Sequence, residues 1–69
     1  MAESVYKVIE LVGTSSKSWE DAVNNIVKKA AKSLRDIRIC EIILLDTKIE
    51  NNKITAYRAR VKLSFKYED

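Results

Sequence analysis

The side chains that could perform acid–base or nucleophilic chemistry are few in this chain and lie far apart. The chain has no histidine, so the most common general base of enzymes is missing. The carboxylates of Glu10, Glu41, Asp46 and Glu50 show no paired spacing. Cys40 is the single cysteine, and without a partner base it is more typical of a small buried hydrophobe than of a nucleophile. These residues predict a protein that is not an enzyme.

A stripe of basic residues is the second chemical feature. Its members alternate with other residues near the end of the chain: Arg58, Arg60, Lys62 and Lys66. Such a stripe fits a solvated or ion-paired sheet face, and it also fits a site for an anion such as phosphate. A sheet that reads nucleic acid needs aromatic side chains on the same face for base stacking. Tyr57, Phe65 and Tyr67 fall on the opposite face. We therefore expect no nucleic-acid partner, although a basic-face nucleic-acid-binding module remains an alternative.

A helix is the first of the elements that the sequence predicts as support for these residues. Apolar residues recur at steps of three and four from Trp19 to Leu34, which predicts an amphipathic helix of about four turns. Ser18 stands at the expected N-cap, and Asp21 follows three residues later as in a capping box. We expect Trp19 to lie in the core on the apolar side of this helix.

Three strands accompany the predicted helix. They are expected at residues 5–12, 37–50 and 53–67, with a turn at residues 13–16 and a two-residue hairpin turn at Asn51 and Asn52. The order is β-α-β-β, an α+β class. In an antiparallel sheet the last strand is then central, because the first two strands run in the same direction. We expect this three-stranded sheet to wrap partly around the long helix, in one domain that covers residues 1–69.

The second strand is predicted to be apolar on both sides. One face carries Ile37, Ile39, Ile43, Leu45 and Ile49, and the other carries Cys40, Ile42 and Leu44. A strand of this kind is normally buried on both faces. One helix covers only one face of a sheet, so a second copy of the chain is the simplest cover for the other face. A chain of 69 residues also has a small core, which favours a homo-oligomer.

Composition sets the remaining expectations. No apolar run approaches the roughly 18 residues of a membrane-spanning helix. A lone cysteine is typical of a cytoplasmic protein. The net charge of +3 permits anionic partners without requiring them.

Three stretches of the sequence resemble one family. They are Val5 to Ser15, Ser18 to Ala22, and the closing strand Val61 to Phe65, within a match from about Ser4 to Tyr67. These stretches resemble the dodecins. The resemblance implies a β-α-β-β protein that assembles into a hollow spherical homododecamer and binds or stores small ligands or ions without catalysis. Many dodecins bind pairs of flavins, such as FMN or riboflavin.

Two positions depart from the flavin-binding pattern. Flavin-binding dodecins place a tryptophan two residues before a glutamate, and here Ile39 precedes Glu41 at that spacing. They also place a glutamine after an aromatic residue, and here Tyr57 is followed by Arg58. The candidate ligand-binding residues are therefore Ile39, Arg58 and Arg60, of which the two arginines could attract a flavin phosphate. We expect weak flavin binding, with a flavin-storage dodecin of altered site as the alternative.

The start of the predicted helix points to a second branch of the family. The Ser18-Trp19-Glu20 start and the Asp36-Ile37-Arg38 stretch resemble the calcium-binding dodecins. The resemblance implies calcium as a ligand. Hard-cation sites need several converging oxygens, which several subunits can supply, and the sequence alone defines no metal ligands.

Overall fold

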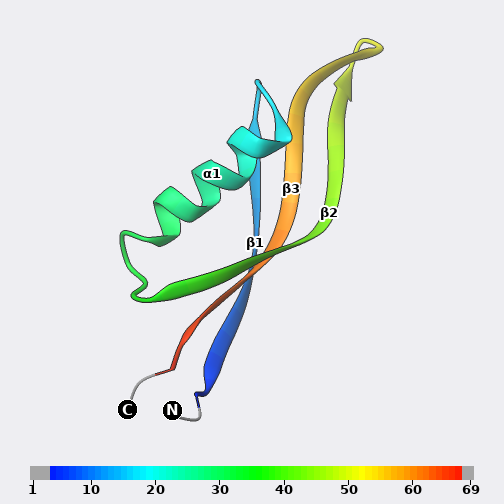
Figure 1. Ribbon diagram of the computed structural model, residues 1–69. Helices are drawn as coiled ribbons and strands as arrows, with labels where there is room; N and C mark the ends of the chain where they lie inside the picture. The colour runs from blue at the N-terminus through cyan, green and yellow to red at the C-terminus, as the bar shows by residue number, and fades with distance from the viewer. Residues whose placement is uncertain (1–3, 68–69) are drawn as a thin grey trace.

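A three-stranded sheet and one helix make up the computed structural model, which describes residues 4–67 (Figure 1). In chain order the elements are β1 (Tyr6–Ser15), α1 (Trp19–Ala30), β2 (Ile37–Glu50) and β3 (Lys53–Lys66). The strands are antiparallel in the order β1-β3-β2. The predicted β-α-β-β topology with the last strand in the centre is confirmed. Helix α1 packs on one face of the sheet, against β1 and β3.

Helix α1 begins where the sequence predicts. The Ser18 hydroxyl oxygen accepts a hydrogen bond from the backbone N–H of Asp21 at 3.0 Å, as an N-cap does. The other half of the predicted capping box differs. The carboxylate of Asp21 accepts a bond from the Ser15 hydroxyl at 2.7 Å, and the Ser15 oxygen accepts one from the Lys17 N–H at 2.9 Å. Ser15 thereby joins the end of β1 to the start of α1.

The helix ends one turn earlier than predicted. Its last residue is Ala30, and the chain continues in tighter turns in which the Ser33 N–H bonds to the Ala30 carbonyl at 3.1 Å. The N–H of Leu34 also reaches the Ala30 carbonyl, at 2.9 Å. Leu34 therefore still packs against the core, which explains why its spacing resembled that of a helical residue.

Strand β1 runs three residues beyond its predicted end. Gly13 was predicted to start a turn, but it lies inside the strand, beneath α1. A Cβ atom at Gly13 would stand 2.7 Å from Cδ1 of Ile26 and 2.9 Å from the carbonyl oxygen of Ala22. Glycine is needed here because the helix approaches the strand too closely for a side chain.

The core lies between α1 and β3. Its fully or nearly buried apolar residues are small or medium in size: Ala22, Ile26, Ala30, Ala59, Val61 and Leu63. The three from β3 alternate along the strand, as the sequence predicted. Three alanines let the helix lie close to the sheet, and half-buried Ile9 and Leu11 extend the contact to β1.

Strand β2 has three register irregularities against β3. They fall between Ile37 and Ile39, between Ile42 and Leu44, and between Lys48 and Ile49. A bulge adds one residue and so exchanges the faces of the side chains that follow it.

The predicted faces of β2 were therefore wrong in detail. Cys40, Ile42 and Leu45 lie opposite the core residues of β3, on the side of α1. Ile39 and Leu44 lie opposite Ser64 and Arg60, on the other side. Apolar side chains are nevertheless exposed on both faces, because α1 leaves β2 largely uncovered.

The β2–β3 hairpin extends past the rest of the molecule. Asn51 and Asn52 form its turn with φ of 52° and 62°, which confirms the predicted two-residue turn. Strand β1 ends at Ser15, opposite Tyr57 of β3. Residues 48–56, here called the hairpin arm, therefore form a two-stranded ribbon that projects beyond β1 and α1 (Figure 1).

Within residues 4–67, no helix is long and apolar enough to cross a bilayer.

Candidate functional site

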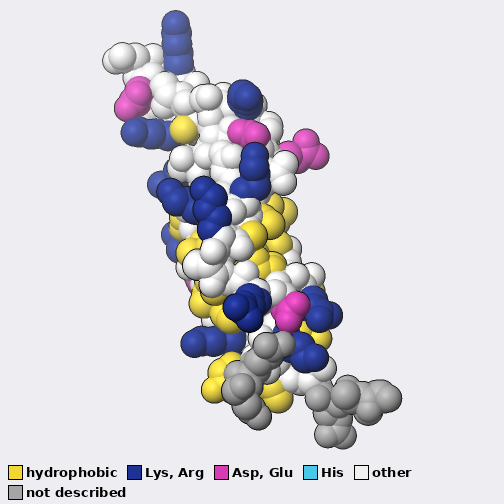
Figure 2. Space-filling model, turned by 90° about the vertical axis from the view of Figure 1, so that its left-hand side faces the viewer, with side chains coloured by type: hydrophobic (Ala, Val, Ile, Leu, Met, Phe, Trp, Pro, Cys, Tyr) yellow, Lys and Arg dark blue, Asp and Glu magenta, His cyan; other side chains and the backbone are white. Residues whose placement is uncertain are grey.

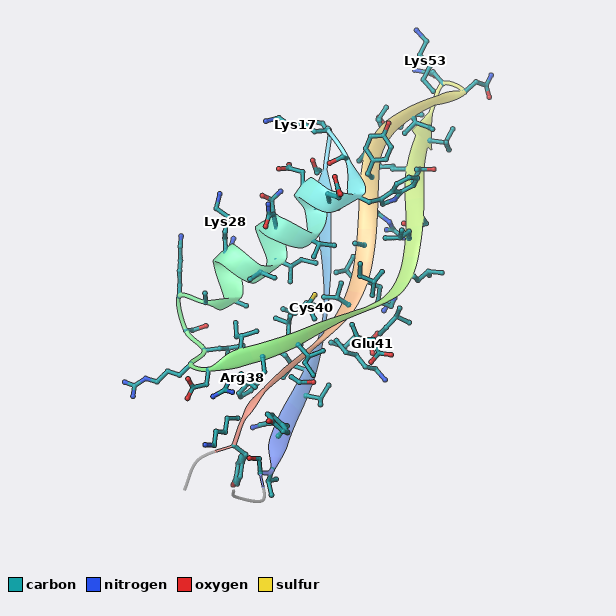
Figure 3. All side chains as sticks on the ribbon, viewed as in Figure 1. Lys17, Lys28, Arg38, Cys40, Glu41 and Lys53 are labelled. Atoms are coloured by element: carbon teal, nitrogen blue, oxygen red, sulfur yellow. The ribbon has the colours of Figure 1, made fainter. Side chains whose placement is uncertain are left out.

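The predicted ligand-binding residues lie on the sheet face that points away from α1, here called the outer face. On β3, Arg58 and Arg60 alternate with buried Ala59 and Val61. Ile39 of β2 lies opposite Ser64, which belongs to the same alternating set as the two arginines. The neighbouring Cys40 and Glu41 lie on opposite sides of β2, with Cys40 towards α1 (Figure 3).

Arg58 is held by Asp46 of the adjacent strand. Its Nε donates to Oδ1 of Asp46 at 2.7 Å, and its Nη2 donates to Oδ2 at 2.8 Å. This bidentate geometry is the strongest form of an arginine–carboxylate pair. Hydrogen bonding by Arg58 lowers the pKa of the Asp46 carboxyl, and the same bond raises the pKa of Arg58. A ligand that uses the Arg58 guanidinium must compete with this carboxylate.

Arg60 also has an acidic partner. Its Nη1 donates to Oε2 of Glu10 in β1 at 2.9 Å. Lys62 lies in register between Glu10 and Glu41, which belong to the two flanking strands. From Arg58 to Lys62 the basic stripe is therefore bordered by carboxylates of β1 and β2, whereas Lys66 lies opposite Tyr6.

One chain does not bring Ile39 and Arg58 together. Ile39 lies beside Ser64, six positions along β3 from Arg58. At the rise of a β-strand this separation is about 20 Å. Ile39 is 59% exposed, so a neighbouring surface can reach it. A small ligand therefore cannot contact both residues of the same chain.

Trp19 is not in the core, contrary to the prediction. It is 37% exposed at the start of α1, over the margin of β2. Its indole Nε1 donates to the backbone carbonyl of Asp46 at 3.0 Å. Its ring meets Tyr57 edge to face, with centroids 5.1 Å apart. With Val23, Ile42 and Leu45 it lines an open groove of about 610 Å³ on the β2 side of the helix.

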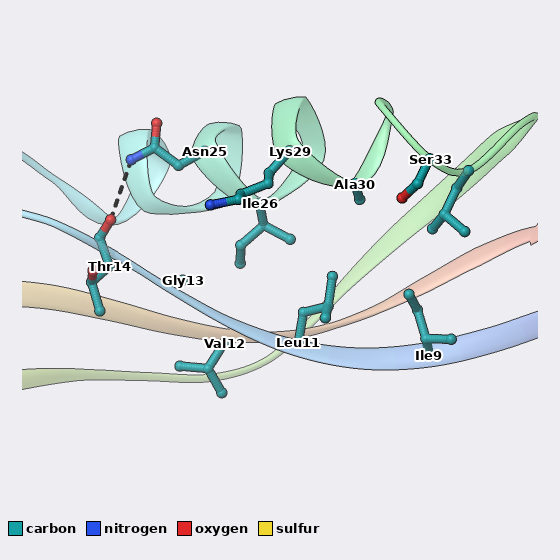
Figure 4. Close-up of a pocket in the computed structure, with 11 residues that line it drawn as sticks. Ile9, Leu11, Val12, Gly13, Thr14, Asn25, Ile26, Lys29, Ala30 and Ser33 are labelled. Carbon is teal, nitrogen blue, oxygen red and sulfur yellow. Dashed lines mark hydrogen bonds between the residues drawn. The ribbon is translucent and has the colours of Figure 1, made fainter.

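A second groove lies on the other side of α1, along β1, with a volume of about 510 Å³. Ile26 points from the helix towards β1, and Leu11 points back towards the helix (Figure 4). Asn25 stands on the polar rim, where its Nδ2 donates to the Thr14 carbonyl at 3.2 Å. No sequence signal indicated this groove, because it depends on how closely Gly13 lets α1 approach β1.

The helix side of the molecule combines basic and apolar surface. Figure 2 views this side and shows lysine and arginine side chains scattered among apolar patches. Cys40 is half-buried beneath it, and burial raises the pKa of the Cys40 thiol. The thiol is therefore less easily ionised than a free cysteine, which fits a packing role.

The acidic residues in the described part of the chain do not form a metal site with one another. Among residues 4–67, no three side chains of histidine, cysteine, aspartate or glutamate gather closely enough to hold a metal ion. Calcium needs six to eight oxygen ligands. The acidic side chains of residues 4–67 therefore do not make a calcium site by themselves.

Comparison with known proteins identifies the family. The dodecin family model matches residues 5–68. The calcium dodecin of Mycobacterium tuberculosis is 41% identical over 63 residues, which cover 91% of this chain and 89% of that protein. The dodecin of Thermus thermophilus is 31% identical and covers 94% of each chain.

Solved structures agree with the sequence comparison. The dodecin of Streptomyces coelicolor superposes with a TM-score of 0.94 at 32% identity, over 100% of this chain and 99% of the other. The crystal structure of M. tuberculosis calcium dodecin, described as having a novel calcium-binding site, gives a TM-score of 0.83 at 42% identity, over 94% and 93% of the two chains. The chain described here belongs to the dodecin family.

Proposed function

We propose that this protein is a non-enzymatic dodecin that assembles into a hollow homododecamer and binds or stores small ligands or ions. The observation that carries the proposal is the surface that one chain leaves exposed. The accessible area is 5515 Å² for a mass of 7.9 kDa. A compact monomer of that mass exposes about 4,400 Å², so roughly 1,100 Å² is in excess.

The shape of the chain supports the same proposal. Its radius of gyration is 14.3 Å, with extents of 53 × 21 × 16 Å. A compact domain of this length has a radius of gyration of about 11 Å. Both outer strands of the sheet, β1 and β2, also have an unpaired edge in the isolated chain. Neighbouring copies would cover these edges and the apolar faces of β2. The number twelve rests on the family.

Calcium is the first ligand that we propose. The support is the calcium dodecin relative and its calcium-binding site. Because the carboxylates among residues 4–67 of one chain do not converge, we propose that the ligands come from two or more copies. Asp46 and Glu10 are engaged by arginines in the isolated chain, so they would have to exchange these partners to bind a cation.

Flavin is the weaker alternative. The Asp46 carboxylate holds Arg58, and Ile39 offers a ligand no aromatic plane. We therefore propose that flavin is not the main ligand. Nucleic acid is also not proposed as a partner, because carboxylates border the basic stripe from Arg58 to Lys62. A cytoplasmic location, inferred from the lone cysteine, completes the proposal.

Native mass spectrometry combined with metal analysis of the purified protein tests this function. We expect a twelve-chain species that retains calcium and loses it when the assembly is dissociated. Calcium retained equally by single chains would contradict a shared site. An assembly that takes up no calcium from a millimolar solution would overturn calcium as the ligand and leave the assembly itself standing.

A further inference from the structure

The groove between α1 and β1 has a polar end and an apolar end. Asn25 and Lys29 stand at one end, on the exposed side of α1, and Ile9 of β1 lies towards the other end (Figure 4). Sites for small molecules have volumes of about 300–1,000 Å³, and they are mostly apolar with a few polar groups. The groove, at about 510 Å³, has this size and this kind of lining.

The polar end offers hydrogen-bond donors to an anion. The Lys29 side chain points along the groove towards Asn25 (Figure 4). Within residues 4–67, the ion pairs involve other basic residues, so no carboxylate engages the Lys29 ammonium. Asn25 donates one N–H to the Thr14 carbonyl at 3.2 Å, and its amide group carries a second N–H. An ammonium and an amide N–H together suit the two acceptor oxygens of a carboxylate.

The surrounding charge has the sign that such an anion requires. None of the described residues that line the groove is acidic. The chain has no aspartate or glutamate from Ala22 to Arg35, and Lys28 and Lys32 add positive charge beside Lys29. This electrostatic environment favours an anionic ligand and disfavours a cationic one.

The rest of the groove suits an alkyl chain. Ile26 and Ala30 of α1 form one wall, and Ile9 and Leu11 of β1 form the other. Thr14 and Ile9, which both line the groove, are five positions apart on β1, or about 16 Å at the rise of a strand. No aromatic side chain is among the described lining residues, so a planar ring would find no stacking partner. The shape and lining therefore select a straight aliphatic chain.

We propose that this groove binds a medium-chain carboxylate, with the carboxylate at Lys29 and Asn25 and the alkyl chain over Leu11 and Ile26. The inference goes beyond the proposed function, because the site lies within one chain and uses neither calcium nor the outer face. Each copy of the chain would hold one such ligand. A second copy of the chain packed into the groove is the competing occupant.

Three ligands with the same alkyl chain test the charge preference. Isothermal titration calorimetry on the assembled protein would compare decanoate, uncharged decanol and decylamine, which is cationic at neutral pH. We expect decanoate to bind once per chain, at least fivefold more tightly than decanol, with decylamine the weakest. Octanoate should bind at least threefold more weakly than decanoate, because it buries less apolar surface.

Two outcomes of this titration would overturn the proposal. Equal affinities for decanoate and decylamine would show that the polar end does not select an anion. No binding from a millimolar decanoate solution would show that the groove is closed in the assembly, as a neighbouring copy packed into it would cause.

Two adjacent lysines supply matched variants. Lys29 lines the groove, whereas Lys28 is exposed and is not among the lining residues. Lys29→Gln and Lys28→Gln remove the same charge from the same helix. We expect Lys29→Gln to weaken decanoate binding at least fivefold and Lys28→Gln to weaken it less than twofold. Equal effects would mean that decanoate responds only to the overall charge, which would overturn the site.

Methyl NMR of the wild type locates the ligand independently of any variant. Decanoate should shift the methyl signals of Ile26 and Leu11 and leave those of Ile42 and Leu45, which line the groove beside Trp19. Shifts confined to Ile42 and Leu45 would place the ligand in that other groove and contradict the proposal.

Failure of this proposal is distinguishable from failure of the proposed function. The mass of the assembly and its calcium content are measured without decanoate, so a lack of decanoate binding would leave both standing. A wild type that consists of single chains would overturn the proposed assembly, and the titration would still test the groove, because its lining residues belong to one chain.

Discussion

The indole Nε1–H of Trp19 donates a hydrogen bond to the backbone carbonyl of Asp46 at 3.0 Å, across 27 positions of sequence. The side chain of the same Asp46 holds Arg58 of β3. One residue of β2 therefore links the start of α1 to the central strand. This link lies where the hairpin arm leaves the rest of the molecule, so it fixes the base of the arm.

Replacing Trp19 by phenylalanine tests this link. The Trp19→Phe variant keeps a ring beside Tyr57 but loses the N–H donor. A typical hydrogen bond contributes about 0.5–1.5 kcal/mol, and partial exposure of Trp19 favours the lower part of that range. Urea unfolding at fixed protein concentration, followed by circular dichroism, measures the difference. Tyr57→Phe is the control and should stay close to the wild type. Equal stability of Trp19→Phe and the wild type would mean that this hydrogen bond does not stabilise the fold.

Gly13 supports the packing of α1 on β1. In Gly13→Ala the added methyl group meets Ile26 and the Ala22 carbonyl, so α1 must shift. Overpacking of this kind costs about 1–3 kcal/mol. Thr14→Ala is the matched control, because Thr14 is the exposed neighbour in the same strand. Thermal unfolding of both variants should show a clearly larger loss for Gly13→Ala, and losses of equal size would argue against a packing role for the glycine.

The Asp46–Arg58 pair predicts a dependence on pH. Because Arg58 lowers the pKa of Asp46 in the folded chain, the pair stabilises the fold above the ordinary aspartate pKa of about 4. That contribution is lost as the pH falls through the lower, folded pKa. Carboxyl NMR should show Asp46 titrating below the range of ordinary aspartates, and Arg58→Gln should return it to that range. A titration of Asp46 that Arg58→Gln leaves unchanged would mean that the pair does not form in solution.

Flavin binding should be weak in the wild type. Ile39 lacks a flat surface for stacking, which is worth roughly 0.5–1.5 kcal/mol per aromatic contact. Arg58 only donates hydrogen bonds and is already paired, so it does not suit the donor and acceptor edge of the flavin ring. Strong quenching of flavin fluorescence at submicromolar protein would contradict this expectation.

The reverse substitutions define the same site. Ile39→Trp combined with Arg58→Gln should raise flavin affinity by more than tenfold, because both missing contacts are restored. Ile39→Leu with Arg58→Gln is the control, since it keeps an apolar but non-aromatic side chain at position 39. If the tryptophan variant bound flavin no better than this control, Ile39 would not lie at the ligand.

Local signals in the sequence predicted the parts of the fold that local physics decides. Asn51 and Asn52 accept positive φ, and Ser18 caps α1 through its own hydroxyl, so both features were predicted correctly. Gly13 was misread because a glycine before Thr14 and Ser15 is typical of a turn. Glycine is required at this position because α1, which begins several residues later in the sequence, packs too closely on β1 to leave room for a side chain.

The rest depended on contacts between distant residues. The bulges of β2 arise from pairing with β3, and apolar residues on every side of the strand gave no sign of where the alternation breaks. The alternation of side chains along a strand correctly placed Arg58 and Arg60 on one face of β3. It could not show that their partners are Asp46, 12 positions away, and Glu10, 50 positions away. The distance between Ile39 and Arg58 also could not be predicted, because it follows from the register of β2 against β3.

Light scattering coupled to size-exclusion chromatography tests the central claim most directly. The claim is that the surface left open by one chain is covered by identical copies. The account predicts a single species of about 95 kDa, twelve times the 7.9 kDa of one chain, at micromolar concentration. A stable species of one chain's mass at that concentration would contradict it.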